Sequence, residues 1–268
     1  MQWNVLADGL TDCFFKVPRE ALVWSYRLDR ILREIERVNP SILCLQELNH
    51  FDLLKEHLHP LGFEFSVYFP KPASPAALLG FPGDGTAVFV KSREFDQIDS
   101  KQVEQVSFRE SDGSCMNQGY VQLRLKPKLV SIPIVLIATH LKAKAEATET
   151  RIRQVDQILK ALEGQEHAIV CGDFNDFPSS PPIQRMLKSG FRSVYTQVLE
   201  IESHYTTWKI RKEGEKKGTI DYIFVRSSAL EAHRVFLVPE DSIVPECRYP
   251  SLEYPSDHIS MAADIIAP

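Results

Sequence analysis

Apolar residues recur along the chain with two different spacings, which predict helices alternating with strands. Between residues 20 and 38 the apolar positions follow helical spacing and stop at Asn39-Pro40, and residues 146–163 show the same pattern. Short, nearly continuous apolar runs predict buried strands at 41–45, 132–138 and 168–171. The sequence therefore predicts an α/β protein.

Weaker patterns complete the predicted set of elements. Residues 51–60 favour a further helix, and strands are predicted at 86–90, 120–126, 220–225, 235–238 and 259–266. Residues 120–126 alternate polar and apolar side chains, which predicts a strand with one solvated face. The short link at 127–131 favours antiparallel neighbours. We expect mixed sheets flanked by helices, and we find no repeat or linker that divides residues 1–268 into separate domains.

Composition narrows the class of protein. The net charge is −5 and no dense run of lysine and arginine occurs, so the sequence lacks the basic track of proteins that follow long nucleic acids. The five cysteines are scattered without a CxxC pair, which argues against a disulfide framework or a zinc site and favours a reducing compartment. No apolar run reaches the roughly 18 residues that a membrane span requires. We expect a cytoplasmic monomer, with an organelle leader outside this sequence as the open alternative.

Polar residues gather where the predicted buried strands end, which is where open α/β sheets place their sites. These candidates are Glu47, His140, Asp173 with Asn175, Asp221, and Asp257 with His258. Each also has a structural interpretation: Asp173 and Asn175 close a turn, Glu47 is a solvated rim residue, and Asp221 faces water. Gly172 is expected to let the backbone approach a ligand closely.

Asp221 is the hardest of these residues to explain structurally, because a carboxylate is unfavourable inside an apolar strand without a partner. His258 could be that partner, since a carboxylate that orients an imidazole is a recurring catalytic arrangement. The cations near these positions are candidates for phosphate contacts or plain surface charges: Lys71, Lys142, Lys144, Lys209 and Arg211. Motifs of P-loop, Rossmann, serine-hydrolase and zincin enzymes do not occur in the sequence.

The order of the polar motifs resembles the endonuclease/exonuclease/phosphatase superfamily. The series runs Gln2-Trp3-Asn4, Leu45-Gln46-Glu47, Thr139-His140-Leu141-Lys142, Gly172-Asp173-Phe174-Asn175, Ile220-Asp221-Tyr222 and Ser256-Asp257-His258. Finer features resemble the nocturnin branch of the carbon-catabolite-repressor-type deadenylases: Phe69-Pro70-Lys71-Pro72, Asn117-Gln118, His140-Leu141-Lys142-Ala143, the segment 205–211 and Tyr254-Pro255-Ser256-Asp257-His258. The resemblance implies a four-layer α-β-β-α sandwich of two mixed sheets flanked by helices.

The resemblance also implies roles for individual residues. Glu47 would be the principal Mg²⁺ ligand, supported by Asn4 and Asp257. Asp173 would activate the attacking water with help from Asn175, and His258, braced by Asp221, would stabilise charge on the phosphate. His140 would contact a phosphate oxygen or assist the leaving group. The implied substrate-binding residues are Lys71, Lys142, Lys144, Arg211, Asn117 and Trp208.

Two departures from the nocturnin pattern leave the substrate open. Lys144 stands where arginine is usual, and residues 79–83 lack the usual paired asparagines. The leading hypothesis is a 2′-phosphatase of NADP(H). The alternatives are a 3′→5′ poly(A) exoribonuclease, with Trp208, Phe81 and Phe177 as candidate stacking residues, and a catalytically silent RNA-binding or scaffold module that keeps the fold. The retained acidic and imidazole residues argue against the silent module.

Overall fold

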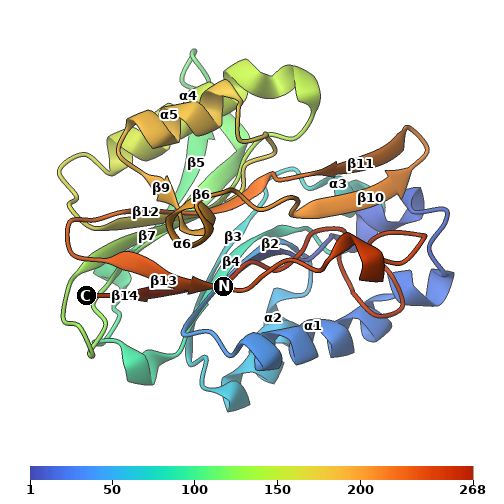
Figure 1. The fold of residues 1–268 in the computed structure, drawn as a ribbon, viewed down its shortest axis with the longest axis horizontal. Coiled ribbons are helices and arrows are strands. Elements are labelled where there is room, and N and C mark those ends of the chain that lie inside the picture. The colour runs from blue at the N-terminus through green and yellow to red at the C-terminus, as the bar shows by residue number, and fades with distance from the viewer. Residues whose placement is uncertain (268) are drawn as a thin grey trace.

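The computed structural model describes residues 1–267 and contains two β-sheets packed face to face (Figure 1). The smaller sheet has four strands in the order β1-β2-β4-β3. Its members are β1 (Gln2–Asn4), β2 (Ile42–Leu48), β3 (Phe65–Pro70) and β4 (Gly85–Val90). β1 and β2 are parallel, whereas the other pairs are antiparallel, so this sheet is mixed.

The larger sheet has six strands in the order β5-β6-β7-β8-β12-β9. Its members are β5 (Val103–Arg109), β6 (Cys115–Leu125), β7 (Ile134–His140), β8 (Ala168–Asp173), β9 (Arg192–Ser193) and β12 (Asp221–Arg226). β7 and β8 are parallel, and the remaining pairs are antiparallel. Two hairpin-like pairs stand apart from both sheets: β10 (Thr207–Arg211) with β11 (Gly214–Gly218), and β13 (Glu231–Val235) with β14 (Ala263–Ile266).

Helices cover the outer face of each sheet (Figure 1). The helices are α1 (Trp24–Val38), α2 (Phe51–Leu58), α3 (Pro75–Leu78), α4 (Thr148–Ala161), α5 (Pro181–Lys188) and α6 (Val194–Leu199). Short 3-10 helices span Asp8–Cys13, Arg19–Leu22, His59–Leu61, Ser92–Glu94, Ser100–Gln102, Ala145–Ala147 and Asp241–Ile243. α1 and α2 share an apolar cluster with the four-stranded sheet, and α4 and α5 share another with the six-stranded sheet.

A third apolar cluster fills the space between the two sheets, with side chains from β2, β4, β6, β7, β8 and β12. Burial of these side chains drives the sheets together, because each apolar side chain removed from water contributes about 1.5–3 kcal/mol. Cys44 and Cys171 belong to this cluster, as predicted for small core residues. The layer order is therefore helix, sheet, sheet, helix, which confirms the sandwich implied by the family resemblance.

Several strand predictions were wrong in detail. The strand predicted at 235–238 is β13, which ends at Val235, and the one predicted at 259–266 is β14, which begins only at Ala263. β1, β3, β5, β9, β10 and β11 were not predicted. β11 has the sequence Gly-Glu-Lys-Lys-Gly and is mostly exposed, so it carries no apolar signal and forms through its pairing with β10.

The predicted solvated face of residues 120–126 is only partly present. Arg124 is exposed, but Gln122 is buried and donates a hydrogen bond to Glu104 of the neighbouring strand. The link at 127–131 joins the antiparallel β6 and β7, as predicted.

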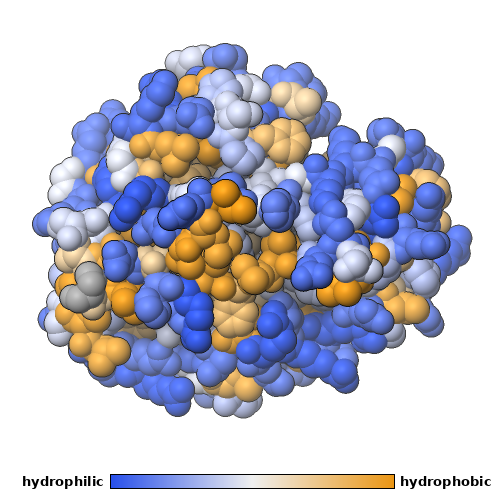
Figure 2. All heavy atoms as spheres, in the orientation of Figure 1, coloured by the Kyte–Doolittle hydropathy of each residue, from blue (hydrophilic) through white to orange (hydrophobic). Residues whose placement is uncertain are grey.

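The face seen in Figure 2 is largely hydrophilic, with apolar side chains gathered near its centre. Exposed apolar residues on and after α6 include Leu199, Ile201 and Leu237. Among the described residues, no helix is both long and apolar enough to cross a membrane.

Candidate active site

Strand register brings three polar side chains together at one edge of the six-stranded sheet. His140 on β7 pairs with Asp173 on β8, and Asp173 pairs in turn with Asp221 on β12. Because neighbouring strands lie roughly 4.8 Å apart, these residues are adjacent although they are distant in sequence. His140 Nε2 lies 3.6 Å from Asp173 Oδ2. The sheet therefore supplies one imidazole and two carboxylates at the same place.

Gly172 allows β7 and β8 to approach each other just before this edge. A Cβ built on Gly172 would lie 1.9 Å from the carbonyl oxygen of Thr139, so any side chain here would push the strands apart. Gly172 thus lets the backbone approach the neighbouring strand, and its predicted close approach to a ligand stays a prediction.

The two oxygens of Asp173 have different partners. Oδ1 accepts a hydrogen bond from the backbone N–H of Asn175 at 2.9 Å, which is the turn considered as the structural interpretation of this pair. Oδ2 accepts from Asn4 Nδ2 at 3.0 Å and lies 3.9 Å from His258 Nε2. Asn175 also donates from Nδ2 to the carbonyl of Leu141 at 3.1 Å. Asp173 thus closes the turn with one oxygen and presents the other to the site.

Glu47 reaches the same place from the four-stranded sheet because β2 is irregular there. The register of β2 against β4 shifts between Leu45 and Leu48, and Glu47 has a φ of 56°. Bulges redirect side chains, and a left-handed glutamate is strained, which is a common feature of functional sites. Its side chain is only 13% exposed, so the interpretation as a solvated rim residue is wrong. Ala7 donates its backbone N–H to Glu47 Oε2 at 3.0 Å.

Asn4 connects the carboxylates that come from the two sheets. Its Nδ2 lies 3.0 Å from both Glu47 Oε1 and Asp173 Oδ2, while its Oδ1 accepts from the backbone N–H of Leu6 at 3.0 Å. The amide nitrogen, and not the oxygen, therefore faces the two carboxylates. In this arrangement Asn4 sets the separation of the carboxylates, and its expected support of the metal stays a prediction.

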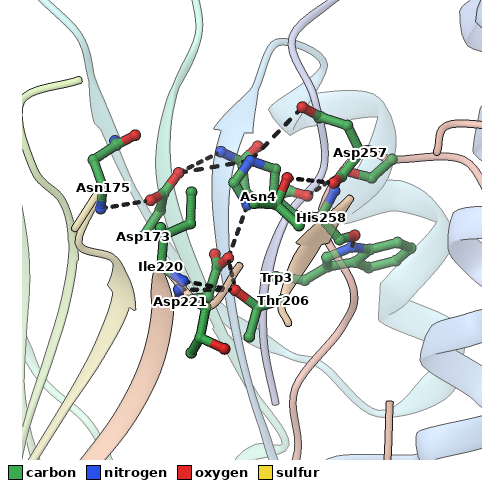
Figure 3. A network of polar contacts seen from close by, with 12 residues as sticks. Trp3, Asn4, Asp173, Asn175, Thr206, Ile220, Asp221, Asp257 and His258 are labelled. Carbon is green, nitrogen blue, oxygen red and sulfur yellow. Dashed lines mark hydrogen bonds and ion pairs between the residues drawn. The ribbon is translucent and has the colours of Figure 1, made fainter. Parts of the chain in front are cut away.

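His258 is held on both its backbone and its ring (Figure 3). Its carbonyl accepts from Trp3 Nε1 at 2.7 Å, and its Nδ1 lies 2.8 Å from Asp221 Oδ2. Asp221 is fully buried and accepts two further hydrogen bonds, from Gln2 Nε2 at 2.9 Å and from Thr206 Oγ1 at 2.7 Å. Asp221 therefore faces His258 and not water, as the catalytic interpretation predicted.

Asp257 is paired with two cations of the β10–β11 hairpin. Its Oδ2 lies 2.6 Å from Lys209 Nζ and 3.2 Å from Arg211 NH2. Lys209 and Arg211 are two residues apart on β10, so their side chains point to the same side of the strand. Lys209 Nζ is also 3.5 Å from His258 Nε2. Asp257 thus fixes two cations beside the site, and its expected support of the metal stays a prediction.

These neighbours set the charge states of the site. Burial raises the pKa of Glu47, but His140 and Lys71 outweigh that effect and lower it to about 2. Burial disfavours a charged His258, but Asp221 and Asp257 outweigh it and raise its pKa to about 9. Burial also raises the pKa of Asp221, and both shifts favour one proton held between Asp221 and His258. At neutral pH the site therefore contains an ionised Glu47 and a protonated His258.

A divalent cation fits the donor atoms found here. Within residues 1–267, one group of potential ligand atoms comes from Glu47, His140 and Asp173, all within 4.8 Å of one another. A second group comes from Asp173, Asp221 and His258, but His258 and Asp221 already bind each other. Hard cations such as Mg²⁺ take one or two carboxylates together with water and phosphate. Glu47 and Asp173 are therefore the residues best placed to hold such an ion.

The predicted phosphate-binding cations lie around this cluster. Lys71 Nζ is 2.6 Å from Asp84 Oδ2, and the charges of Lys71 and Arg211 both act on Glu47. Lys142 and Lys144 are exposed on the loop that follows His140.

Asn117 and Trp208, whose predicted substrate contacts stay predictions, both bind protein groups. The side-chain amide of Asn117 accepts from the backbone N–H of Ala73 at 2.6 Å and donates to its carbonyl at 2.7 Å. Trp208 is buried and donates from Nε1 to Glu215 Oε1 at 2.6 Å. The Lys217 ammonium lies 3.9 Å from its ring centroid, and the Arg248 guanidinium lies 4.6 Å away. Asn117 therefore fixes the loop at Ala73, and Trp208 fixes the β10–β11 hairpin.

Sequence reasoning gave no role to Gln2 and Thr206, which complete the hydrogen bonding of Asp221. Their position beside recognised motif residues was the only available signal. Gln2 precedes Trp3-Asn4, and Thr206 lies within the segment 205–211.

Comparison with known proteins shows the family of this chain. The sequence pattern of the Endonuclease/Exonuclease/phosphatase family matches residues 1–258. The chain belongs to this family. Similar members include nocturnin from Homo sapiens, 35% identical over 98% of this chain, and nocturnin from Drosophila melanogaster, 30% identical over 98%. The chain spans 64% of the length of the human protein and 46% of the fly protein.

Solved structures of the family share the fold. The human nocturnin catalytic domain with a bound sulfate anion matches with a TM-score of 0.81 and 30% identity, covering 100% of this chain and 93% of that chain. ANGEL2, described as a 2′,3′-cyclic phosphatase, matches with a TM-score of 0.82 over 98% of this chain and 93% of that chain. Its 20% identity supports the shared fold alone. The resemblance to nocturnin found in the sequence is confirmed.

Proposed function

We propose that this protein removes the 2′-phosphate of NADP(H) by Mg²⁺-dependent hydrolysis. The observation that carries the proposal is the convergence of Glu47, Asp173 and His258, which are contributed by both sheets and the loop before β14. A phosphate dianion resists attack by water, so a hydrolase must gather positive charge around it and hold the water in line.

Glu47, Asp173 and His258 would have different roles in this hydrolysis. Glu47 and Asp173 would hold Mg²⁺, which, when bound, polarises the phosphoryl oxygens and offsets the charge that develops on them. Asp173 would also orient the attacking water and accept its proton, because Asn175 and Asn4 fix both of its oxygens. His258 would donate a hydrogen bond from Nε2 to a phosphate oxygen, since Asp221 fixes Nδ1 and favours the imidazolium.

Three further observations support a small anionic substrate. The net charge of −5 argues against a long nucleic-acid track, whereas Lys71, Lys142, Lys144 and Arg211 provide a compact set of cations. The similar nocturnin structure contains a sulfate, which is a tetrahedral oxyanion like phosphate. The resemblance to nocturnin-type enzymes implies the NADP(H) 2′-phosphate as the group removed.

The alternative is a 3′→5′ poly(A) exoribonuclease that uses the same centre. One observation favours it: the rings of Phe81 and Phe177 are exposed, as platforms for stacking bases would be. Trp208, the third candidate platform, is covered by Lys217 and Arg248.

One experiment separates the two activities. Purified protein with Mg²⁺ is offered NADPH and a 5′-labelled oligo(A), and phosphate release and oligonucleotide length are measured. We expect phosphate from NADPH and intact oligo(A); a ladder of shortened oligo(A) without phosphate release would instead establish the alternative. Glu47→Gln should abolish either activity. Glu56→Gln, an exposed carboxylate on α2, is the matched control and should leave activity unchanged.

A further inference from the structure

Arg151 in the first turn of α4 is a buried arginine with many partners. It is 1% exposed, and its Nε donates to Asp176 Oδ2 at 2.8 Å. NH1 donates to the carbonyls of Lys142 at 2.9 Å and Lys144 at 2.7 Å, and NH2 donates to the carbonyl of Ala145 at 3.4 Å. A guanidinium is costly to bury unless its donors are paired, so these bonds are a requirement of its position.

The partners of Arg151 belong to two loops that leave the active-site edge. Residues 141–147 follow His140 at the end of β7, and Asp176 follows Asp173 at the end of β8. Gln154, almost one turn further along α4, accepts from the backbone N–H of Lys142 at 2.9 Å. Side chains of α4 thus hold the backbone of residues 142–145, which we call the lysine arm.

The lysine arm has a fixed backbone and exposed charges. Lys142 and Lys144 are exposed, whereas their carbonyls bind the buried Arg151. Lys144 has a φ of 83°, a conformation that glycine adopts freely and that strains a lysine. Such strain persists only where the surroundings determine the conformation. The bond from Arg151 to the Lys144 carbonyl supplies that constraint.

We propose that Arg151 is a positioning residue that holds Lys142 and Lys144 ready to bind the diphosphate bridge of the substrate. The proposal rests on the proposed function for the identity of the substrate, but Arg151 itself touches only protein groups. Holding the backbone in advance reduces the ordering that must accompany binding, so it strengthens binding without contributing to the chemical step. A lysine at position 151 cannot replace the planar fork that reaches several carbonyls.

Steady-state kinetics on NADPH test this role through non-additivity. We expect Arg151→Lys to raise KM about tenfold and to leave kcat within about threefold, because the arm binds a part of the substrate that does not react. In the Lys142→Ala/Lys144→Ala background, Arg151→Lys should raise KM no further. An equal rise in KM in both backgrounds, or no rise in either, would overturn the proposal. Arg153→Lys, whose side chain is 41% exposed, is the matched control.

Two measurements keep the test independent of folding and of the substrate. Hydrogen exchange of the lysine arm, residues 142–145, should become faster in Arg151→Lys, while β8 keeps its wild-type exchange. Unchanged exchange in the arm overturns the proposal. Binding of inorganic pyrophosphate without added metal should weaken about tenfold in both Arg151→Lys and Lys144→Gly, since the glycine removes the charge and keeps the φ. Wild-type protein that binds pyrophosphate and leaves NADPH intact would refute the proposed function alone. Pyrophosphate affinity unchanged by Arg151→Lys would refute the role of Arg151.

Discussion

Replacing Asp221 with asparagine tests whether His258 acts as a cation. Asp221 Oδ2 lies 2.8 Å from His258 Nδ1, and together with Asp257 it raises the pKa of His258 to about 9 against the opposing effect of burial. Because the pKa is raised above the ordinary value of about 6.5, the imidazolium is present below about pH 9 and is lost as the pH rises through that value. Near pH 7.5, about 97% of His258 carries the proton.

The asparagine keeps the size of the side chain and removes its charge. With an ordinary pKa of about 6.5, only about 10% of His258 would be protonated near pH 7.5, and burial would lower that fraction further. This loss alone lowers kcat about tenfold, and the weaker orientation of the ring adds to it. The expected total is on the order of 10²–10³, as for other preorganised electrostatic partners. Lowering the pH to about 6 should recover roughly eightfold relative to wild type, because about 75% of the rings regain the proton.

The assay is phosphate release from saturating NADPH between about pH 6 and pH 10, for wild type and Asp221→Asn. The kcat of wild type should fall on the alkaline side with a midpoint near pH 9, and the kcat of the variant should fall with a midpoint at or below about pH 6.5. Asp264→Asn is the control, because Asp264 pairs with Arg234 at an exposed position. A variant with the wild-type kcat, or with the wild-type midpoint, would refute the cationic role of His258.

Three further predictions concern the metal and the framework of the site. Glu47→Gln should weaken Mg²⁺ binding at least about tenfold by calorimetry and lower kcat on the order of 10²–10³, because it removes a buried negative charge; equal Mg²⁺ affinity would contradict the ligand assignment. Chelation with EDTA should abolish activity and added Mg²⁺ should restore it, whereas activity that survives chelation would exclude the metal. Arg27→Met should cost about 3 kcal/mol of unfolding free energy in urea, since it removes the buried 2.5 Å partner of Asp8 and leaves His50 as the remaining one. The control Arg33→Met, 74% exposed, should change stability by less than about 0.5 kcal/mol, and similar values for the two variants would contradict the buried pairing.

The location of the site could be predicted from the sequence because apolar runs mark strands that end at a common edge. Glu47, His140 and Asp173 each follow such a run, and the structure brings all three together. The motif order then identified the family, which no single motif could do. Asp221 was recognisable because an acidic residue inside an apolar strand requires a partner.

The finer roles could not be predicted because they depend on side-chain direction and on contacts between distant segments. Asp257 follows the same pattern as the other candidates, yet its carboxylate is taken by two cations of a hairpin that has no apolar signal. Asn117 and Trp208 were assigned to the substrate from resemblance alone, and their hydrogen bonds in the structure go to protein groups. Arg151 was overlooked because one arginine in a helix normally indicates a solvated surface.

The position of the site between two sheets explains why its hydrogen-bond network is so extensive. Glu47 and Asn4 come from the four-stranded sheet, whereas Asp173 and Asp221 come from the six-stranded sheet. The sheets touch through apolar packing, which is not directional and does not by itself fix the distance between two carboxylates. A displacement of about 1 Å at a reacting centre can cost on the order of 10²-fold in rate. Asn4, bonded to one carboxylate from each sheet, sets that distance and thereby couples the packing of the core to the geometry of the reaction.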